Sequence, residues 1–446
     1  MTTLLRPPGP KGKPLVGSLL DFFHDMLGFL SKVAHEYGDI VYFGLGPRKA
    51  FLLNHPDFVK DVLVTHHRNF LKSRALERSK LVLGNGLLTS EGDLHLRQRR
   101  LIQPVFHHMR ITAYCEVMVN YASRIGEQWE EETTVDMHEE MMRLTLAIVG
   151  KTLFDADVES EADEIGKALT EVITQFPRLL FPLSELLDNI PLPKNIRFNK
   201  ARQRLDTTIY RMIEKRRDGE KNRGDLLSML LLAQDEEGDT IGMTDLQVRD
   251  EAMTLFLAGH ETTANALTWT WYLLSQYPSV EKRLHEELDT VLGGRLPTLE
   301  DLELLSYTRM VLTEAMRLYP PAWVVVRRAR NDYEVGGYVV PAGADILMSQ
   351  YIIHRDPRYY PDPFRFYPER WIPEQQASRP PFAYFPFGGG PRRCIGESFA
   401  WMEGILVIAT LAAKWKMSLV PGHRVELQPS ITLRPKYGMR MTLERR

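Results

Sequence analysis

The chain has 446 residues, of which 44% are hydrophobic and 26% charged, and its formal net charge is −2. This composition is typical of a globular protein with a large core, and the near-neutral charge argues against wholesale binding of nucleic acid. The two cysteines, Cys115 and Cys394, cannot form a disulfide framework. They favour a reducing compartment or a single thiol with a special role.

The sequence begins with a lead rich in proline and glycine, residues 1–20, that lacks the layout of a signal peptide. The longest apolar runs, such as residues 404–413, have about half the length that a membrane-spanning helix needs. We therefore expect a cytoplasmic protein without a transmembrane segment. The stretch RPPGP, residues 6–10, is also typical of a hinge that follows a membrane anchor, so removal of an anchor stays open as an alternative.

Short alternating segments predict a β-hairpin near residues 39–54. Residues 93–290 have a mostly helical pattern, interrupted by the apolar, proline-broken stretch 176–195. That stretch is consistent with a mobile lid or with a surface that touches lipid. The plainer interpretation is a loop packed on its own core. Peripheral contact with a membrane is therefore an open expectation.

The longest helix candidate covers residues 243–278, with Thr244 as a start signal and Pro278 as a stop signal. Further elements are predicted in this order: a helix at 299–318, strands with a Gly-Gly turn at 324–349, an irregular proline-rich segment at 354–371 and a last helix at about 396–415. No segment has the composition of a linker between domains. We therefore expect one domain over residues 1–446.

The stretch FPFGGGPRRCIG, residues 385–396, places Cys394 just before the last predicted helix. The helix dipole and unpaired N–H groups favour an anion there, and Arg392 and Arg393 should lower the pKa of the thiol further. No neighbouring cysteine or histidine completes a zinc site, and a cysteine nucleophile would need a histidine from a distant part of the chain. A thiolate that ligates heme iron fits best. An inert cysteine in a glycine-rich turn remains the alternative.

Phe387, Arg392, Cys394 and Gly396 lie in a stretch that resembles, position for position, the heme-binding loop of the cytochrome P-450 family. The resemblance implies heme b (iron protoporphyrin IX) as the cofactor and Cys394 as its iron ligand. It also implies that Arg392 pairs with a heme propionate, that Phe387 packs over the ligand and that Gly396 leaves room for the porphyrin. The family's fold is mainly α with small β-sheets, in one large triangular domain, with heme beside the 243–278 helix.

The sequence AGHETT, Ala258–Thr263, lies in the middle of the longest predicted helix. A mid-helix glycine and a threonine that bonds back to the preceding turn both weaken a helix, which suggests a groove for a small ligand. On these residues alone, an acid and an alcohol facing solvent is an equal interpretation. The stretch resembles the family's oxygen-activation motif. That resemblance implies that Glu261 and Thr262 deliver protons and that Ala258 lines the pocket beside the heme.

Glu314 and Arg317 lie three residues apart on one helix face, where an exposed ion pair is the default interpretation. They resemble the family's Glu-x-x-Arg pair, and Arg370, in the segment Pro-Glu-Arg-Trp, resembles the third member of that group. The segment carries Trp371 where many family members have phenylalanine. The resemblance implies that Glu314, Arg317 and Arg370 support the thiolate loop structurally.

His95 and Arg99 lie four residues apart, on one face of a predicted helix, where two cations could bind carboxylates or simply face solvent. The segment resembles the family's third long helix, in which a Trp-x-x-x-Arg pattern donates to heme propionates. His95 stands at the tryptophan position, so the role is less secure. Arg327 resembles a further propionate partner, with Arg328 as its alternative.

The resemblance implies a heme-thiolate monooxygenase that hydroxylates or epoxidises a lipophilic small molecule with O2. It implies that two electrons come from a separate ferredoxin- or flavodoxin-type reductase system, which basic residues near the thiolate, among them Arg392 and Arg393, would attract. The overall pattern resembles bacterial fatty-acid and xenobiotic hydroxylases. We expect a monomer.

Two rival functions stay open. One is an enzyme of the same fold that uses peroxide, or that isomerises or dehydrates oxygenated lipids. The other is a non-catalytic heme sensor or carrier.

Overall fold

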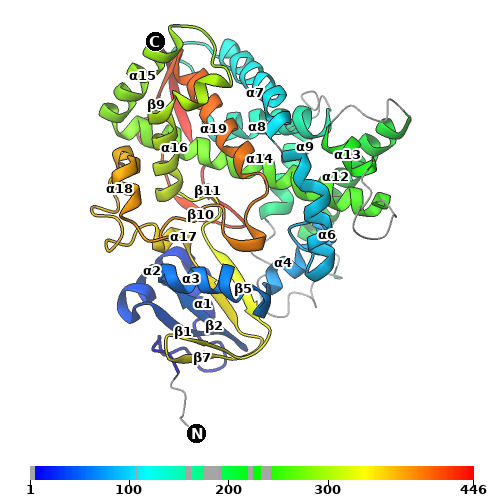
Figure 1. Cartoon of the computed structure of the whole chain (residues 1–446), viewed down its shortest axis with the longest axis vertical. Coiled ribbons are helices and arrows are strands. Elements are labelled where there is room, and N and C mark those ends of the chain that lie inside the picture. Colours follow the sequence, from blue (N-terminus) through cyan, green and yellow to red (C-terminus); the bar gives the residue numbers. More distant parts are fainter. Residues whose placement is uncertain are drawn as a thin grey trace.

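A computed structural model describes residues 6–106, 108–155, 162–174, 190, 192–218, 225–232 and 243–446. Figure 1 shows a larger helical part and a smaller part built around a β-sheet, with the N-terminus beside the smaller part. The predicted fold class, mainly α with small sheets, is confirmed. Most of the 176–195 stretch lies outside the described residues, so the lid, the lipid contact and the packed loop all remain predictions.

The main sheet organises the smaller part of the molecule. Its strands lie in the order β1 (Ile40–Leu45), β2 (Arg48–Leu53), β8 (Asp345–Met348), β5 (Val325–Ala329) and β3 (Phe70–Lys72). β1 and β2 form the predicted hairpin, with Ile40 opposite Leu53. Only β2 and β8 run parallel in this sheet. Successive residues of a strand face opposite sides, and Ile346 and Leu347 accordingly enter two different buried clusters.

Short helices surround this sheet and lead from it to the helical part. They are α1 (Leu19–His24), α2 (Met26–Tyr37), α3 (Pro56–Lys60), a π-helical turn (Asp61–Thr65), a 3-10 turn (His67–Asn69), α4 (Arg74–Arg78), α5 (Lys80–Leu83), α6 (Gly92–Ile102) and a 3-10 turn (Gln103–Phe106). The α2 side chains of Leu30 and Val33 pack in the same buried cluster as Val41 of β1, so α2 covers one face of the sheet.

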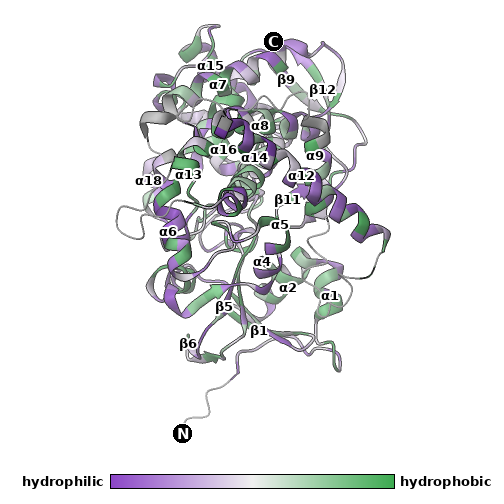
Figure 2. Cartoon of the chain, turned by 90° about the vertical axis from the view of Figure 1, so that its right-hand side faces the viewer, coloured by the Kyte–Doolittle hydropathy of each residue, from purple (hydrophilic) through white to green (hydrophobic). Residues whose placement is uncertain are grey.

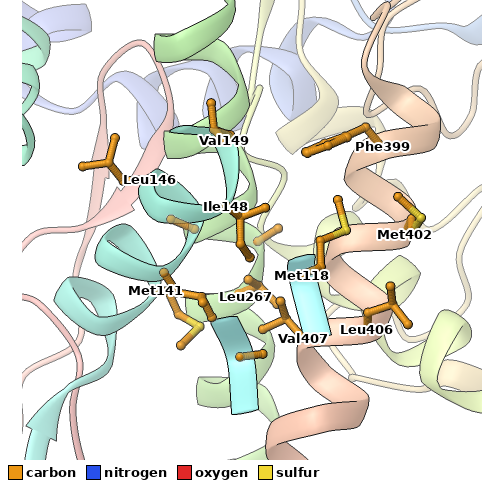
Figure 3. Close-up of a cluster of buried hydrophobic side chains, with 14 of the residues drawn as sticks. Met118, Met141, Leu146, Ile148, Val149, Leu267, Phe399, Met402, Leu406 and Val407 are labelled. Carbon is orange, nitrogen blue, oxygen red and sulfur yellow. The ribbon is translucent and has the colours of Figure 1, made fainter. Parts of the chain in front are cut away.

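Most of the described helices of the larger part are long. They are α7 (His108–Gln128), α8 (Met137–Phe154), α9 (Ala162–Thr174), α12 (Pro193–Asp218), α13 (Leu226–Leu232), α14 (Asp245–Gln276), α15 (Pro278–Leu292), α16 (Ser306–Leu318) and α19 (Glu397–Ala412). α14 runs through their centre and packs against α8, α16 and α19. Figure 3 shows the core at this crossing, where side chains of α7, α8, α14 and α19 converge, for example Met118, Ile148, Leu267 and Val407.

The predicted 243–278 helix is confirmed as α14. Its start is a capping box: Gln247 N donates to the Thr244 hydroxyl at 3.3 Å, and Thr244 N donates to the Gln247 side chain at 2.9 Å. The helix ends before Pro278, which opens α15 as its first residue.

The predicted 299–318 helix is divided in two. A 3-10 turn covers Glu300–Glu303, and α16 begins only at Ser306. The carboxylate of Glu287, from α15, accepts hydrogen bonds from Tyr307 N at 2.6 Å and Thr308 N at 2.8 Å. A tertiary contact therefore caps α16 and sets its start.

The remaining elements are small. β4 (Thr134–Asp136), β12 (Arg440–Arg445) and β9 (Trp415–Leu419) form a three-stranded sheet, and two hairpins pair β6 (Tyr333–Val335) with β7 (Tyr338–Val340) and β10 (Leu427–Pro429) with β11 (Leu433–Pro435). Short helical turns lie at α17 (Gln350–Ile353), Pro368–Trp371, α18 (Pro373–Ala377) and Gly390–Arg392. The predicted Gly-Gly turn joins β6 to β7, and the 354–371 segment is mostly irregular, as expected.

Figure 2 shows hydrophilic residues on α6 and α12, at the outside of the molecule. Within the described ranges, no helix is both long enough and apolar enough to cross a membrane.

Candidate active site

The middle of α14 is open on one side only. From Val248 to Trp271, every residue is buried except Ala258, Gly259 and Thr262, which share one face of the helix. The Thr262 hydroxyl donates to Ala258 O at 2.7 Å, which is the predicted bond back to the preceding turn. The open face therefore presents a small side chain, a glycine and an alcohol.

The turn before α19 presents the thiol of Cys394. Cys394 N donates to Phe387 O at 3.0 Å. Gly390 has a φ of 65°, and a Cβ at this position would lie 1.9 Å from Leu63 O, so the turn requires glycine here. Phe387 packs on Trp401, with ring centroids 5.7 Å apart. Cys394 itself keeps exposed surface.

The pKa of Cys394 does not follow the sequence expectation. Although the residue has exposed surface, the surrounding protein removes most of its solvation and raises the pKa of its thiol to about 11. The Gly396 backbone N–H and Arg393 act against this rise but do not reverse it. Arg392 pairs with Glu91 instead. The prediction of a lowered pKa is therefore wrong for the protein alone, because desolvation outweighs the nearby positive charge.

Basic side chains from four segments gather at the edge of the main sheet. Lys72 of β3 lies directly opposite Arg327 of β5, and like charges in that position destabilise a strand pair. Burial, Arg392 and Arg327 lower the pKa of Lys72 to about 6, against the opposing effect of Glu91. Burial, Lys72 and Arg392 lower the pKa of His95 to about 4. These basic groups, which we call the cation cluster (Lys72, His95, Arg327 and Arg392), carry more positive charge than Glu91 balances.

Two members of the cation cluster hold the loop before α6 at the carbonyl oxygen of Leu87. Lys72 Nζ donates to Leu87 O at 2.8 Å, and His95 Nδ1 lies 3.2 Å from the same oxygen. His95 Nε2 is buried and has no partner among the described residues. The side chain of His95 therefore has an unused polar atom close to Lys72 and Arg392.

Arg327 and Arg328, which were predicted as alternatives, are adjacent on β5 but have different surroundings. Arg328 pairs with Glu77 and so has a carboxylate partner of its own. Arg327 faces the cation cluster, and burial and Arg392 lower its pKa to about 10. The geometry therefore favours Arg327 as the anion-binding member of the pair.

Arg99 contacts the thiolate loop. Its Nη1 donates to Arg393 O, next to Cys394, at 2.9 Å. Burial lowers the pKa of Arg99, and Cys394 acts in the opposite direction. Arg99 is therefore placed where it holds the thiolate loop.

Glu314, Arg317 and Arg370 form a buried group, so the interpretation as an exposed pair is wrong. Both oxygens of Glu314 accept bonds from Arg317, each at 2.8 Å, and Arg370 Nε donates to Glu314 Oε1 at 3.2 Å. Trp371 Nε1 donates to Glu314 Oε2 at 2.9 Å. The Glu314 and Arg317 side chains are 0% exposed, and such a dry pair requires these additional hydrogen bonds.

His354 links this group to the thiolate loop. Arg317 Nη1 donates to His354 O at 2.7 Å, and His354 Nε2 accepts from Phe385 N at 3.0 Å. Burial and the neighbouring Arg317 and Arg355 hold the pKa of His354 well below its usual range, so the ring is neutral and can accept. His354 therefore connects the buried group of Glu314, Arg317 and Arg370 to the thiolate loop, as their proposed structural role would require.

Glu261 does not lie on the open face with Thr262. Its Oε1 accepts from the Thr432 hydroxyl at 2.6 Å, and the side chain is buried. Burial raises the pKa of Glu261, while Arg434, Thr432 and Asn265 act against the rise. The acid and the alcohol of the motif therefore face different surroundings on adjacent positions of α14.

An apolar pocket lies next to the open face. It is lined by Ser79, Val82, Leu83, Val172, Phe198, Leu257 and Ile431. Leu257 directly precedes Ala258 on α14. The lining residues favour an apolar ligand.

Residues 7–441 match the family model described as cytochrome P450. The chain belongs to the cytochrome P450 family. It is a P450 monooxygenase, and heme b is its cofactor.

Two relatives and one solved structure illustrate the likeness. Cyclooctatin synthase of Streptomyces melanosporofaciens is 41% identical over 427 residues, which cover 95% of this chain and 92% of that protein. Pentalenene oxygenase of Streptomyces avermitilis is 35% identical, over 92% of this chain and 91% of that protein. The structure of retinoic acid-bound cyanobacterial CYP120A1 superposes with a TM-score of 0.88 at 27% identity, covering both chains completely.

The residues of this P450 fit heme b. Cys394 offers an exposed sulfur, the ligand that P450 iron takes. The cation cluster and the free Nε2 of His95 suit the carboxylates of heme. A Cβ at Gly396 would meet Phe106 only at 3.7 Å, an ordinary contact, so no protein neighbour requires glycine there. Gly396 is the N-cap of α19, where glycine is favoured, and the missing side chain also leaves space for a porphyrin edge.

Sequence reasoning missed two residues of this site, Lys72 and His354. Lys72 lies outside the strands predicted from the sequence, and its partner in the sheet, Arg327, is far away in the chain. His354 lies in the HRDP segment, and no spacing rule connects it to Phe385.

Proposed function

We propose that this P450 hydroxylates or epoxidises a terpene-class substrate, with dioxygen and two electrons from a separate redox partner. The observation that supports the substrate class is the mostly apolar lining of the pocket at Leu257 of α14. The names of similar proteins point the same way, since they include cyclooctat-9-en-7-ol 5-monooxygenase, pentalenene oxygenase and carotene epsilon-monooxygenase. The resemblance to fatty-acid and xenobiotic hydroxylases stays a second candidate class.

Bound heme supplies the oxygen-activating chemistry, and a cysteine thiolate ligand favours O–O cleavage. We propose that Cys394 is that ligand and that Lys72, His95, Arg327 and Arg392 hold the heme carboxylates. Arg392 would then exchange Glu91 for a carboxylate of heme. The proton of the Cys394 thiol leaves when the metal binds, since metal ligation displaces the proton of a thiol even where burial favours it.

The overall reaction consumes the substrate, dioxygen, two electrons and two protons, and yields the oxygenated product and water. The protein therefore has to supply protons to one side of a dry site. We propose that Thr262 presents a hydroxyl on the open face and that Glu261 is the acid of the motif, although its carboxyl group bonds Thr432 away from that face.

A substrate panel tests the proposal. Titration of the heme-loaded protein with terpenes, fatty acids, steroids and polar drugs should shift the heme absorption spectrum with terpenes at the lowest concentrations. Turnover with NADPH and surrogate redox proteins should then give a product with one added oxygen. A spectral response confined to fatty acids or to polar compounds would contradict the proposed substrate class.

The iron ligand is tested separately. The reduced protein with carbon monoxide should show the red-shifted absorption of thiolate-bound heme, and Cys394→Ser should lose it. Cys115→Ser is the matched control, because Cys115 is the other free cysteine and is buried. If Cys394→Ser kept the thiolate spectrum, the assignment of the ligand would be wrong.

The rival functions make different predictions. An enzyme that uses peroxide would turn over with peroxide alone and gain nothing from a reductase. A sensor or carrier would need no proton delivery, so Thr262→Ala would leave it unaffected. In a monooxygenase, Thr262→Ala should divert electrons from product to hydrogen peroxide.

A further inference from the structure

Glu91 is the N-cap residue of α6, and its side chain turns away from that helix. An N-cap side chain usually accepts a hydrogen bond from the first turn of its own helix, but the carboxyl group of Glu91 makes no such bond. Its Oε1 instead accepts from Lys72 N, in β3, at 2.5 Å, and its Oε2 accepts from Arg392, in the thiolate loop. Glu91 therefore joins three segments of the chain at the cation cluster.

The charge of Glu91 acts on three members of the cation cluster. It forms an ion pair with Arg392, in which the two side chains are 28% and 18% exposed, so water screens their charges only in part. It also opposes the fall in the pKa of Lys72, to about 6, and of Arg327, to about 10, both of which are lowered mainly by burial. A second carboxyl group that acts on Lys72, that of Glu251, is mostly neutral at pH 7, because burial raises its pKa to about 8. Of these two groups, Glu91 is therefore the one that brings negative charge to the cluster.

The balance of charges shows what Glu91 contributes when heme is bound. Heme b carries two carboxylates, and nearby anions favour the charged form of a lysine, so they would return Lys72 to its cationic form. His95 can donate a hydrogen bond as a neutral ring, since burial, Lys72 and Arg392 lower its pKa to about 4. The positive charges of Lys72, Arg327 and Arg392 are then balanced by the two heme carboxylates and Glu91. Without Glu91, one positive charge would remain beside the heme.

We propose that the negative charge of Glu91 lowers the reduction potential of the bound heme and weakens the hold of the cation cluster on the heme carboxylates. This rests on the proposed function, in which the cluster holds those carboxylates. Reduction adds one electron, taken from the redox partner, and a fixed negative charge nearby makes that addition less favourable. The same charge repels the heme carboxylates, and the ion pair with Arg392 competes with them. Glu91 is a positioning residue in this role, because it acts through the cluster and takes no part in bond making.

Reductive titration of the heme-loaded protein tests the effect on the potential. Glu91→Gln keeps the shape of the side chain and removes its charge. At a fixed applied potential, the ratio of ferrous to ferric heme should therefore rise about tenfold, which is an upward shift of about 59 mV for one electron. An unchanged or lower potential in Glu91→Gln would overturn the proposal.

Three further variants control for changes other than charge. Glu91→Asp restores the charge and should reverse most of the shift. Glu91→Ser removes the charge but supplies a favoured N-cap for α6, so it should raise the potential even if Glu91→Gln folds poorly. Glu77→Gln makes the same change on a carboxylate that pairs with Arg328, the neighbour of Arg327 on β5, and should leave the potential unchanged.

Lys72→Met separates this proposal from the role of the cation cluster itself. It removes a positive charge but keeps the backbone N–H that donates to Glu91, so it should shift the potential downward. A shift with Lys72→Met and none with Glu91→Gln would overturn the role of Glu91 while the cluster keeps its own. No shift with either variant would overturn the proposed binding of the heme carboxylates, and this inference with it.

The rate of heme loss gives a second measurement, in which a purely structural role has the opposite sign. If Glu91 only held Arg392 in place, Glu91→Gln would release that arginine, and heme would leave faster. If the charge of Glu91 opposes the heme carboxylates, Glu91→Gln should slow heme transfer to a high-affinity acceptor protein several-fold. The carbon monoxide spectrum should stay unchanged in each variant. Faster heme loss from Glu91→Gln than from the unmodified protein would contradict the proposal.

Discussion

At the scale of single residues, the most informative position is Lys72. It lies opposite Arg327 in the β3–β5 pair, and nearby cations together with burial lower its pKa to about 6. Glu91 is a described carboxylate beside this charge, and it pairs with Arg392, so the arrangement can accept a further anion. We infer that the carboxylates of heme are that anion, and that the repulsion in the sheet is relieved when heme binds.

Replacing Lys72 should therefore weaken heme binding. Lys72→Met should speed heme loss by about tenfold, because a hydrogen bond to a charged group contributes about 1.5–3 kcal/mol. Heme transfer to a high-affinity acceptor protein measures this rate. Lys49→Met, on an exposed lysine of β2 in the same sheet, is the control. Equal rates of heme loss in the two variants would show that Lys72 does not hold the cofactor.

Glu314 makes the second prediction at this scale. Glu314→Gln leaves the guanidinium of Arg317, which is 0% exposed, without its carboxylate. The free energy of unfolding should fall by about 3–5 kcal/mol, as for other broken buried pairs. Urea unfolding measures the loss. Glu286→Gln, in the exposed pair with Lys282, should change stability by less than about 1 kcal/mol. Similar losses in both variants would rule out a bracing role for Glu314.

The same residues show what the sequence can and cannot predict. Spacing alone places Glu314 and Arg317 on one helix face, but their burial depends on Trp371 and the irregular 354–371 segment crossing over them. Only the family resemblance predicted that group. Cys394 shows the opposite case, since its position before α19 was predictable while its raised pKa depends on crowding by the folded chain.

At the scale of elements, local signals predicted the helix boundaries wherever the cap is local. α14 starts at the expected Thr244, because its capping box lies within four residues of sequence. α16 starts at Ser306, about two helical turns later than expected. The reason is that its cap is the side chain of Glu287, which belongs to another helix. A distant cap leaves no signal in the local pattern.

α19 carries a buried acid that makes stability depend on pH. Burial raises the pKa of Glu403 from 4.5 to about 8, with Thr263 of α14 acting against the rise. Between these values the folded chain holds a proton that the unfolded chain has released, so the contribution of Glu403 to stability falls as pH rises.

Glu403→Gln removes this titration. The stability of the variant relative to the unmodified protein should therefore increase from pH 5 to pH 8, by up to about 1.4 kcal/mol per pH unit. Urea unfolding at several pH values measures the difference, and Glu286→Gln, on an exposed carboxylate, gives the background. A stability difference that stays constant with pH would show that Glu403 does not hold a proton in the folded protein.

At the scale of the whole molecule, we propose that the electron donor approaches the thiolate side. Arg393 is exposed there but pairs with Glu397, so part of its charge is already balanced. Arg100, at the end of α6 next to Arg99, is exposed on the same helix. We infer that an acidic donor protein would use this region.

The steady-state rate with a separate acidic donor should fall as salt concentration rises, because salt screens the attraction between exposed charges. Arg100→Glu should raise the KM for the donor several-fold without changing the carbon monoxide spectrum, and Arg330→Glu, on an exposed arginine at the main sheet, should not. A KM that is insensitive to both salt and Arg100→Glu would place the docking surface elsewhere.

The single domain over residues 1–446, the monomeric state and the cytoplasmic location remain predictions at this scale. The fold class could be predicted from sequence because long helical patterns and two hairpins are local. The spatial order of the main sheet could not, because β8 enters between β2 and β5, which are far apart in the chain. The buried contact between Glu261 and Thr432 could not be predicted either, since it joins α14 to a residue far along the chain.

α14 separates two different environments. Ala258 and Thr262 lie on the open face of the helix, whereas Glu261 and Asn265 lie in its buried part and contact the Thr432 hydroxyl. Directed evolution could therefore change the pocket around Leu257 for new substrates while the buried polar contacts of Glu261 stay intact. Inserting a single residue into this helix would rotate the residues on one side of the insertion by about 100° relative to those on the other. Side chains would then face the wrong environment, and no substitution in the pocket could correct this.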